Sequence, residues 1–574
     1  MRVLFLHPDD TPDGAAWAHD RWDLVVDLAF ASSYVYEEWS RRLGARVISI
    51  HQLDTGTEGY RWVNQIFAHG RGQLLDRMGL DWWEILSMES YQQLRLLYLA
   101  NRLRPEIRGE NVELTASRPH LFITVASALF GRRIRCLQKS PRGAVNRLER
   151  IVRAVRSLDP AQMVQIAFDK WDPAYGWRRR IADGKRAKRK APCVLLPSAY
   201  SNVTRSVLAY ATQLPERQFL LATTRSSAIP LKAQNNVSVA PLAAYAQPAD
   251  SVRSETHELT RRWEQFVSSI AGDCEESQAA ARSGLWTYFP EHLGIGLRLR
   301  EAWKTLFDTE PVSAVLCGDD LNFHTRLPLM LASGRGIKSI YCSHGALDGG
   351  FLFKQPTAEL YLVKGEMERD YLQRVSSIAP ASIVVGAPGP RGMAQADTSG
   401  HDGIVFFSQP FELEGGRTAE IFREVLPILL KVARARGKRV IVKLHPFESI
   451  RARRRLVQSA LPDIDCSQIE FVGGVHPEQV MSRAWCGVTV DSSVAVECAL
   501  RGIPFFLCGW LDFGGMGYLE QFGRYNVGQV LHSPVELERL PELVAKHQST
   551  AETLDRLWHP VDRIQLQETL FGAG

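Results

Sequence analysis

Two short motifs in the last third of the chain combine side chains that suit phosphate binding. The first is Lys443-Leu-His445-Pro446, which ends an apolar strand pattern that begins at residue 439. The His-Pro step occurs four times in the chain. Only two of the four follow an apolar strand pattern, and only His445-Pro446 lies in the same half as the second motif. His445 is therefore interpreted as a ligand-binding residue, with a structural turn as the alternative.

The second motif is Asp491-Ser492-Ser493 followed by Glu497, where a strand pattern passes directly into a helix pattern that ends at Gly502. Free backbone N–H groups at a helix start, with two hydroxyls beside them, suit a phosphate group. The carboxylate of Glu497, one turn later, could accept hydrogen bonds from ribose hydroxyls. An ordinary helix cap with a first-turn acid explains this motif on its own. Two motifs at the mouth of one sheet favour a nucleotide site.

Carboxylates and an imidazole follow two strand patterns of the first half. Asp319-Asp320 ends one apolar run, and His344 ends the next, with Asp348 shortly after it. Adjacent carboxylates rarely share a face of a strand, so one of the pair is expected to face a cleft and the other to cap the following helix. We favour Asp320 as the cleft carboxylate. His344 is expected to assist it, and a core histidine is the alternative reading.

The elements that must position these residues alternate between short β-branched runs and longer helical patterns, which is typical of parallel βαβ construction. Residues 58–107 and 250–308 interrupt the series with apolar positions at helical spacing, and we expect helical insertions there. A second βαβ series starts after a Gly- and Pro-rich connector near residue 386. The sequence therefore predicts an α/β fold with two Rossmann-like domains, residues 1–385 and 386–574, whose strand ends open on a shared crevice.

The composition is that of an ordinary globular protein: 574 residues, 45% of them hydrophobic and 23% charged, with a formal net charge of +6. No window resembles a signal peptide or a membrane span, and a cytoplasmic location is expected. The nine cysteines include no C-x-x-C pair, which indicates reduced thiols. The mild charge and the lack of a recognised motif argue against nucleic-acid binding. The sequence contains no G-x-G-x-x-G, Walker or H-E-x-x-H motif.

Eight basic residues crowd between Arg178 and Lys190. Such a run can attach a protein to the anionic inner face of a membrane, at about 1 kcal/mol per basic residue near the surface. A solvated connector is the alternative. We expect peripheral contact with the cell membrane if the acceptor is lipid-linked.

Taken together, Lys443-Leu-His445-Pro446, Asp491-Ser492-Ser493, Glu497 and the final Arg501-Gly502-Ile503-Pro504 step resemble the donor half of a GT-B glycosyltransferase. More narrowly, they are similar to the bacterial Kdo transferases and HP-motif sialyltransferases of capsule and lipopolysaccharide synthesis. The resemblance implies a CMP-activated acidic sugar as donor, most specifically Kdo, and a surface-polysaccharide, O-antigen or lipid-linked glycan as acceptor. It also implies that the histidine-proline step and the serine pair hold the nucleotide without a metal.

The chain departs from the sialyltransferase pattern at the acid-acid-Gly motif. Leu347-Asp348-Gly349 lacks the first acid, and Asp319-Asp320 is not followed by glycine. This favours a retaining Kdo transferase with an aspartate nucleophile, although the anomeric outcome stays open. The alternatives are a CDP-glycerol or other polyol phosphotransferase of the teichoic-acid type and a non-catalytic glycan-binding relative. Asp463-Ile-Asp465, in a polar connector, is interpreted as a solvated turn, so no metal or other cofactor is expected.

Overall fold

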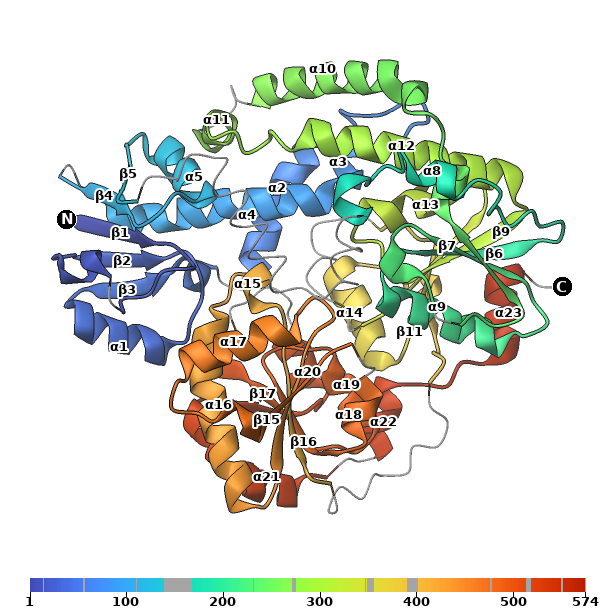
Figure 1. Cartoon of the computed structure of the whole chain (residues 1–574). Helices are drawn as coiled ribbons and strands as arrows, with labels where there is room; N and C mark the ends of the chain where they lie inside the picture. Colours follow the sequence, from blue (N-terminus) through green and yellow to red (C-terminus); the bar gives the residue numbers. More distant parts are fainter. Residues whose placement is uncertain are drawn as a thin grey trace.

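Parallel strands form three separate sheets in the computed structural model of this protein (Figure 1). The structure describes all residues except 14, 55–56, 110, 139–167, 231, 271–274, 346, 348–355, 390–400, 475–476, 513–517, 549–550 and 573–574. The first sheet has the order β3-β2-β1-β4-β5 and consists of β1 (Arg2–Leu6), β2 (Leu24–Asp27), β3 (Arg46–Ser49), β4 (Glu113–Ala116) and β5 (Arg135–Cys136). Helices α1 (Ser33–Leu43) and α5 (Leu121–Phe130) belong to this unit.

The second sheet has seven strands in the order β12-β11-β10-β9-β6-β7-β8. Its strands are β6 (Cys193–Ser198), β7 (Phe219–Thr223), β8 (Val237–Pro241), β9 (Val312–Cys317), β10 (Lys338–Cys342), β11 (Leu360–Val363) and β12 (Ile383–Val385). Its helices are α8 (Arg178–Ile181), α9 (Ser201–Gln213), α13 (Phe323–Ser333) and α14 (Glu366–Ser376).

The third sheet has six strands in the order β15-β14-β13-β16-β17-β18. Its strands are β13 (Gly403–Phe407), β14 (Arg439–Lys443), β15 (Ile469–Val472), β16 (Ala484–Thr489), β17 (Phe505–Cys508) and β18 (Gln529–Leu531). Its helices are α15 (Phe411–Glu414), α16 (Thr418–Ala435), α17 (Ile450–Ala460), α18 (Pro477–Met481), α19 (Val494–Leu500), α20 (Tyr518–Arg524), α21 (Leu540–Lys546) and α22 (Ala551–Leu557). The last helix, α23 (Arg563–Phe571), returns to the second sheet, where Phe571 packs against Phe219.

The expected class, α/β with parallel Rossmann-like sheets and large helical insertions, is confirmed. Residues 1–385 contain the first and second sheets, and residues 386–574 contain the third sheet. The division into two domains at these bounds stays a prediction. Buried apolar strands such as β1 and β6 occur in both the first and the second sheet, so the sequence pattern did not reveal which sheet a strand joins.

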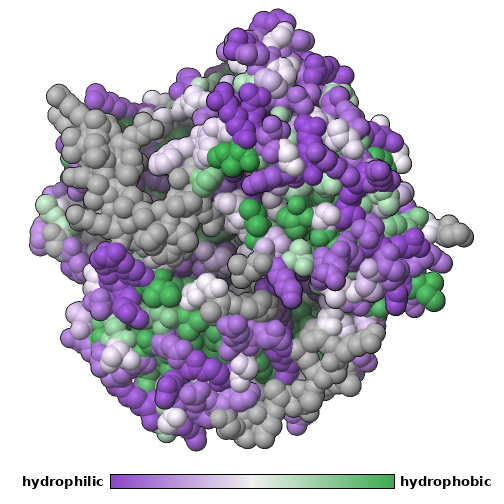
Figure 2. Space-filling view, turned by 45° about the vertical axis from the view of Figure 1, so that its right-hand side comes forward, coloured by the Kyte–Doolittle hydropathy of each residue, from purple (hydrophilic) through white to green (hydrophobic). Residues whose placement is uncertain are grey.

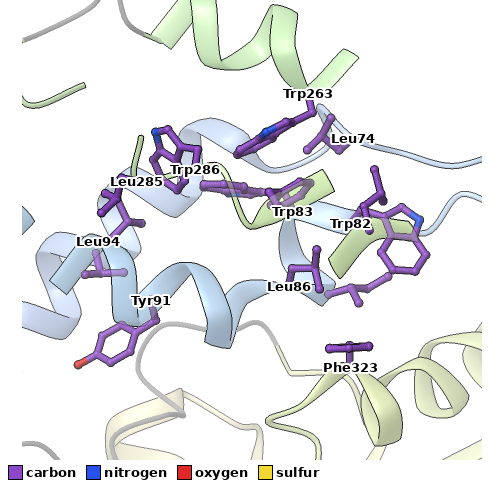
Figure 3. Packing of buried hydrophobic residues seen from close by; sticks show 14 of the residues in the cluster. Leu74, Trp82, Trp83, Leu86, Tyr91, Leu94, Trp263, Leu285, Trp286 and Phe323 are labelled. Atoms are coloured by element: carbon purple, nitrogen blue, oxygen red, sulfur yellow. The ribbon is translucent and has the colours of Figure 1, made fainter. Parts of the chain in front are cut away.

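The helical insertions join the first and second sheets into one hydrophobic cluster. They comprise α2 (Thr57–Gly70), α3 (Trp82–Ile85), α4 (Ser87–Leu103), α10 (Arg253–Ile270), α11 (Glu275–Arg282) and α12 (Phe289–Thr309). Figure 3 shows Trp83, Trp263 and Trp286 gathered where these helices meet. Beside them the fully buried Arg300 pairs with Asp76 at 2.6 Å, so its charge is compensated inside the core.

One arginine fastens the first sheet to the third. Arg417, at the start of α16, donates two hydrogen bonds to the Asp27 carboxylate, each at 2.6 Å, and both side chains are buried. The backbone of Phe30 also bonds to Gly415 and Arg417. The paired geometry of a guanidinium and a carboxylate fixes orientation as well as distance. The third sheet is therefore held against the first as well as against the second.

Within the described part of the chain, no helix is long and apolar enough to cross a membrane. Figure 2 shows hydrophilic residues interspersed with separate hydrophobic patches on one face of the molecule.

Candidate functional site

The order in which the chain adds strands to the third sheet reverses at β13. The chain runs from β13 to β14 and β15 on one side and then crosses to β16, β17 and β18 on the other. Ligands of doubly wound sheets bind at the carboxyl ends of the strands beside such a reversal. Three loops meet there: Ser408-Gln409 after β13, the His445 loop after β14, and Asp491-Ser492-Ser493 after β16. The structure thus brings the two sequence motifs together at one crevice, which we call the donor crevice.

The His445 loop holds its imidazole in one tautomer. The Phe447 amide donates to Nδ1 of His445 at 3.3 Å, so the ring proton is on Nε2. Burial lowers the pKa of His445 to about 4. At neutral pH the side chain is therefore an uncharged imidazole with Nε2–H as a hydrogen-bond donor. Pro446, the next residue, is exposed.

Glu448 stabilises this loop through hydrogen bonds, and the sequence analysis missed it. Its carboxylate accepts the His445 amide at 2.7 Å, the Ser408 hydroxyl at 2.8 Å and Nε of Arg453 at 2.6 Å. It therefore ties the loops after β13 and β14 to helix α17. Its only signal in the sequence is its place three residues after His445.

Lys443 adds positive charge behind the loop. Its ammonium donates to the carbonyl of Leu444 at 2.7 Å and is nearly buried. Burial, together with Arg205 of the second sheet's helix α9, lowers the pKa of Lys443, while Glu448 opposes the shift.

Asp491 is buried with one carboxylate oxygen unsatisfied. The residue is 8% exposed, and no described residue bonds to its Oδ1. Burial, and the nearby Asp512, raise the pKa of Asp491 to about 6, although a hydrogen bond from Gln409 opposes this. A buried acceptor without a donor is costly, so it points to a missing hydrogen-bond partner such as a ligand hydroxyl.

The other residues of this motif are less constrained. The Ser492 hydroxyl accepts the Val494 amide at 3.4 Å, whereas Ser493, at the N-cap position of α19, makes no side-chain cap bond. Glu497 is half-buried on α19. Since α19 has only seven residues, its dipole is a weak source of positive charge, and the side chains of the crevice matter more than the helix start.

Replacing Asp491 with Asn is expected to stabilise the fold at neutral pH. The folded-state pKa of about 6 lies above the ordinary 3.8, so folding pays an ionisation cost above pH 6 that disappears below pH 4. That cost is on the order of 2–3 kcal/mol. The Tm of the variant should be higher than the Tm of the parent at pH 7.5, and the difference between the two should shrink towards pH 4.5. An equal difference at both pH values would contradict this reading.

The second sheet has its own reversal, between β6 and β9. Tyr200 follows β6, Asp319 and Asp320 follow β9, and His344 follows β10. Asp319 accepts the Leu321 amide at 2.9 Å and also bonds the Asn322 side chain, so it supports the turn before α13. Asp320 is 1% exposed and accepts the Thr357 hydroxyl at 2.9 Å. Both carboxylates are therefore buried and hydrogen bonded.

His344 has the opposite tautomer from His445. Its Nδ1 lies 2.8 Å from the carbonyl oxygen of Gly318 and must donate to it, which leaves the lone pair on Nε2. No described residue bonds to Nε2. The side chain is partly exposed. His344 can therefore accept a proton, whereas His445 can donate a hydrogen bond.

Lys364 fixes the loop that carries His344, and the sequence analysis missed it too. Its ammonium donates to the carbonyls of Ser343 at 3.1 Å and Gly345 at 2.7 Å, on either side of His344. Glu368 of α14 holds that ammonium at 2.8 Å. Asp348, the remaining candidate catalytic residue, lies outside the described residues.

The strand-end loops at the reversal in the second sheet lie opposite those at the reversal in the third sheet. The ring of Phe447, in the His445 loop, lies 6.0 Å from that of Tyr200. A Cβ built on Gly345 would stand 3.3 Å from the Ser493 hydroxyl, so the His344 loop closely approaches the start of α19. Gln521 of α20 donates to the carbonyl of Leu347 at 2.9 Å. The His344 loop of the second sheet and the donor crevice of the third sheet therefore border the same space.

No family model matches the chain, and no curated protein matches its sequence. Solved structures with a similar arrangement include UDP-GlcNAc 2-epimerase of Methanocaldococcus jannaschii, at 12% identity and a TM-score of 0.38, covering 64% of this chain and 97% of that chain. A variant of the wall teichoic acid polymerase TagF matches at 10% identity and a TM-score of 0.38, covering 74% and 96%. CalG4, the calicheamicin glycosyltransferase, matches at 12% identity and a TM-score of 0.36, covering 67% and 95%. Likenesses this low assign no activity to this chain.

Proposed function

We propose that this chain is a GT-B-type glycosyltransferase that moves a sugar from a cytidine-nucleotide donor to a hydroxyl group of a glycan. The observation that carries the proposal is the pairing of two strand-end crevices with complementary histidines. His445 offers a hydrogen-bond donor beside Lys443, and His344 offers a lone pair across the same space. Following the sequence motifs, the donor is a CMP-activated acidic sugar, most specifically CMP-Kdo.

In this scheme the donor crevice stabilises the departing CMP. The Nε2–H of His445 donates to a phosphate oxygen, and Lys443 supplies positive charge behind it. The unsatisfied Oδ1 of Asp491 and the carboxylate of Glu497 accept hydrogen bonds from the nucleoside, and the hydroxyls of Ser492 and Ser493 line the phosphate side. Because these groups meet the phosphate charge, we expect turnover to persist in excess EDTA.

His344 then acts as the general base. Its Nε2 takes the proton of the acceptor hydroxyl, the oxygen bonds to the anomeric carbon, and CMP leaves with the electrons of the broken carbon–oxygen bond. Because Asp319 and Asp320 are buried and hydrogen bonded, this single displacement fits their contacts better than an aspartate nucleophile. The configuration of the sugar is inverted as a result.

A CDP-polyol phosphotransferase is the second candidate, and the same contacts favour it. Transfer of a phosphoryl group needs a base for the hydroxyl and cations for the phosphate, but no carboxylate beside an oxocarbenium-like centre. His344 and the donor crevice would supply both requirements.

Product analysis separates the two candidates. The full chain is incubated with CMP-Kdo, CMP-sialic acid, CDP-glycerol and UDP-sugars, with and without EDTA, and products are resolved by mass. Release of CMP with transfer of a sugar alone supports the glycosyltransferase. Release of CMP with a phosphate retained on the product identifies the phosphotransferase. If no donor is consumed but CMP binds, the chain is a non-catalytic relative.

The basic run between Arg178 and Lys190 is only partly available for a membrane. Arg178 pairs with Asp172, Arg186 bonds the Ala244 carbonyl, and Arg189 bonds Gln218. Exposed basic residues remain, and exposed apolar side chains lie nearby: Arg180, Lys185, Lys188, Lys190, Trp171, Trp177 and Ile181. The proposed membrane contact therefore rests on a smaller patch, which we call the α8 patch, than the sequence implied.

Changing Trp171, Arg180, Ile181 and Lys185 to Ser is expected to abolish flotation with anionic liposomes at low salt. These exposed residues combine an apolar anchor with positive charge. Vesicles of phosphatidylcholine alone serve as the control, and neither protein should float with them. Equal flotation of the parent and the variant with anionic liposomes would remove the membrane assignment.

A further inference from the structure

The first sheet has a crevice of its own that the proposed chemistry does not use. Its chain runs from β1 to β2 and β3 on one side and then crosses to β4 and β5 on the other. His7 follows β1, and Arg118 and His120 follow β4, so all three stand at this reversal. The His7 amide donates to the Ser117 hydroxyl at 2.9 Å, which joins the two loops. Reversals of this kind are where parallel sheets bind ligands.

The two histidines present hydrogen-bond donors. The Asp9 amide donates to Nδ1 of His7 at 3.1 Å, and the Phe122 amide donates to Nδ1 of His120 at 3.2 Å. Both ring protons are therefore on Nε2. Burial lowers the pKa of both side chains, that of His120 to about 4. Two uncharged imidazoles, with ring centroids 5.6 Å apart, thus hold fixed N–H groups.

An ion pair beside them has unsatisfied atoms. Arg118 lies 2.6 Å from Oδ1 of Asp10, whose side chain is 8% exposed. No described residue bonds to Oδ2 of Asp10 or to Nε of Arg118. The Asp10 oxygen therefore lacks a hydrogen-bond donor, and the Arg118 nitrogen lacks an acceptor, although the two charges of the pair cancel. Both of these atoms are themselves buried. The Arg118 side chain as a whole is 39% exposed and that of His7 is 19% exposed, so the guanidinium and the imidazole are partly accessible from outside.

Arg417 prepares this crevice and links it to the donor crevice. It donates to the carbonyl oxygens of His7, Pro8 and Asp10, which fixes the loop after β1. The same arginine belongs to the connection that leaves β13 at Ser408 and passes through α15. The segment from Ser408 to Arg417 therefore begins at the donor crevice and ends at the crevice of the first sheet.

We propose that this crevice binds the hydroxyl groups of a glycan. Sugar hydroxyls both donate and accept, which matches the two imidazole N–H donors, the partly exposed guanidinium of Arg118 and the exposed carboxylate of Asp9 beside His7. The imidazoles are neutral and the Asp10–Arg118 ion pair is balanced, while the carboxylate of Asp9 lies 3.7 Å from Nδ1 of His7. The set therefore has no surplus positive charge, and an uncharged polyol suits it better than a free anion. Its identification as the acceptor rests on the proposed function, whereas the binding itself does not.

The test uses the full chain and a panel of neutral oligosaccharides built from glucose, galactose, mannose, rhamnose and N-acetylglucosamine, with inorganic phosphate as the anionic probe. The double variant His7→Asn/His120→Asn keeps an acceptor for the Asp9 and Phe122 amides but removes both Nε2–H donors. Glycan binding by calorimetry is expected to weaken at least tenfold, and Arg118→Gln should also weaken it. CMP binding should not change in either variant.

The matched control is His69→Asn/His257→Asn, since both of these histidines are exposed and lie on helices α2 and α10. It should bind glycan like the parent. The proposal is overturned if the double variant retains parental affinity, if no oligosaccharide of the panel binds, or if only phosphate binds. If the parent protein does not bind CMP, the proposed function is wrong. The glycan-binding results would still decide this proposal, because they do not depend on CMP.

Discussion

Replacing His344 with Asn is expected to lower kcat by about 10²- to 10⁴-fold, the usual contribution of a positioned general base. The Asn amide can still donate to the Gly318 carbonyl, which keeps the local bond that Nδ1 makes. What disappears is the lone pair of Nε2. The affinity for CMP, measured by calorimetry, should stay within about twofold of the parent because His344 belongs to the opposite sheet.

The control for this variant is His257→Asn, an exposed position on α10. Asp320→Asn is measured in parallel, because the sequence motif singled out this carboxylate. If His344→Asn turns over at the parental rate while Asp320→Asn is inactive, the catalytic group is the carboxylate. In that case, a sugar adduct on Asp320 in the absence of acceptor would identify it as the nucleophile.

Replacing His445 with Asn is expected to weaken CMP binding about ten- to hundredfold, which corresponds to a hydrogen bond to a charged group of about 1.5–3 kcal/mol. Asn can still accept the Phe447 amide, so the loop is preserved and only the Nε2–H donor is lost. His559→Asn is a matched control, since His559-Pro560 is another histidine-proline step after α22, and its hydrogen bonds to Lys364 and Ala387 are made by its backbone and stay in the variant. Parental affinity in His445→Asn would show that the imidazole does not contact the phosphate.

The sequence predicted the strands that precede Asp319, His344, His445 and Asp491, because buried parallel strands have an apolar pattern that is easy to recognise. It did not predict β4, β8, β12 or β18. It placed Lys443, His445 and Asp491 at the strand ends of one sheet, and β14, β13 and β16 are adjacent in that sheet. Their role in binding a nucleotide stays a prediction. It did not separate the first sheet from the second, since strand pairing depends on packing between segments far apart in the chain.

The sequence was least informative about the residues that hold the loops of the site in place. Glu448 and Lys364 act through hydrogen bonds to backbone groups of neighbouring loops, and no motif spacing reveals such bonds. The tautomers of His344 and His445 are equally hidden, because each depends on whether Nδ1 faces a carbonyl or an amide. These contacts leave a lone pair on Nε2 of His344 and a proton on Nε2 of His445, although both histidines follow apolar strands.

Hydrogen–deuterium exchange of the full chain with and without CMP tests the central claim most directly, because it locates the nucleotide without assuming an activity. We expect CMP to slow exchange in the loops after β13, β14 and β16, around Gln409, His445 and Ser493, with little change around His7 and His120. Protection confined to the first sheet, or no protection in these three loops at saturating CMP, would contradict the donor crevice.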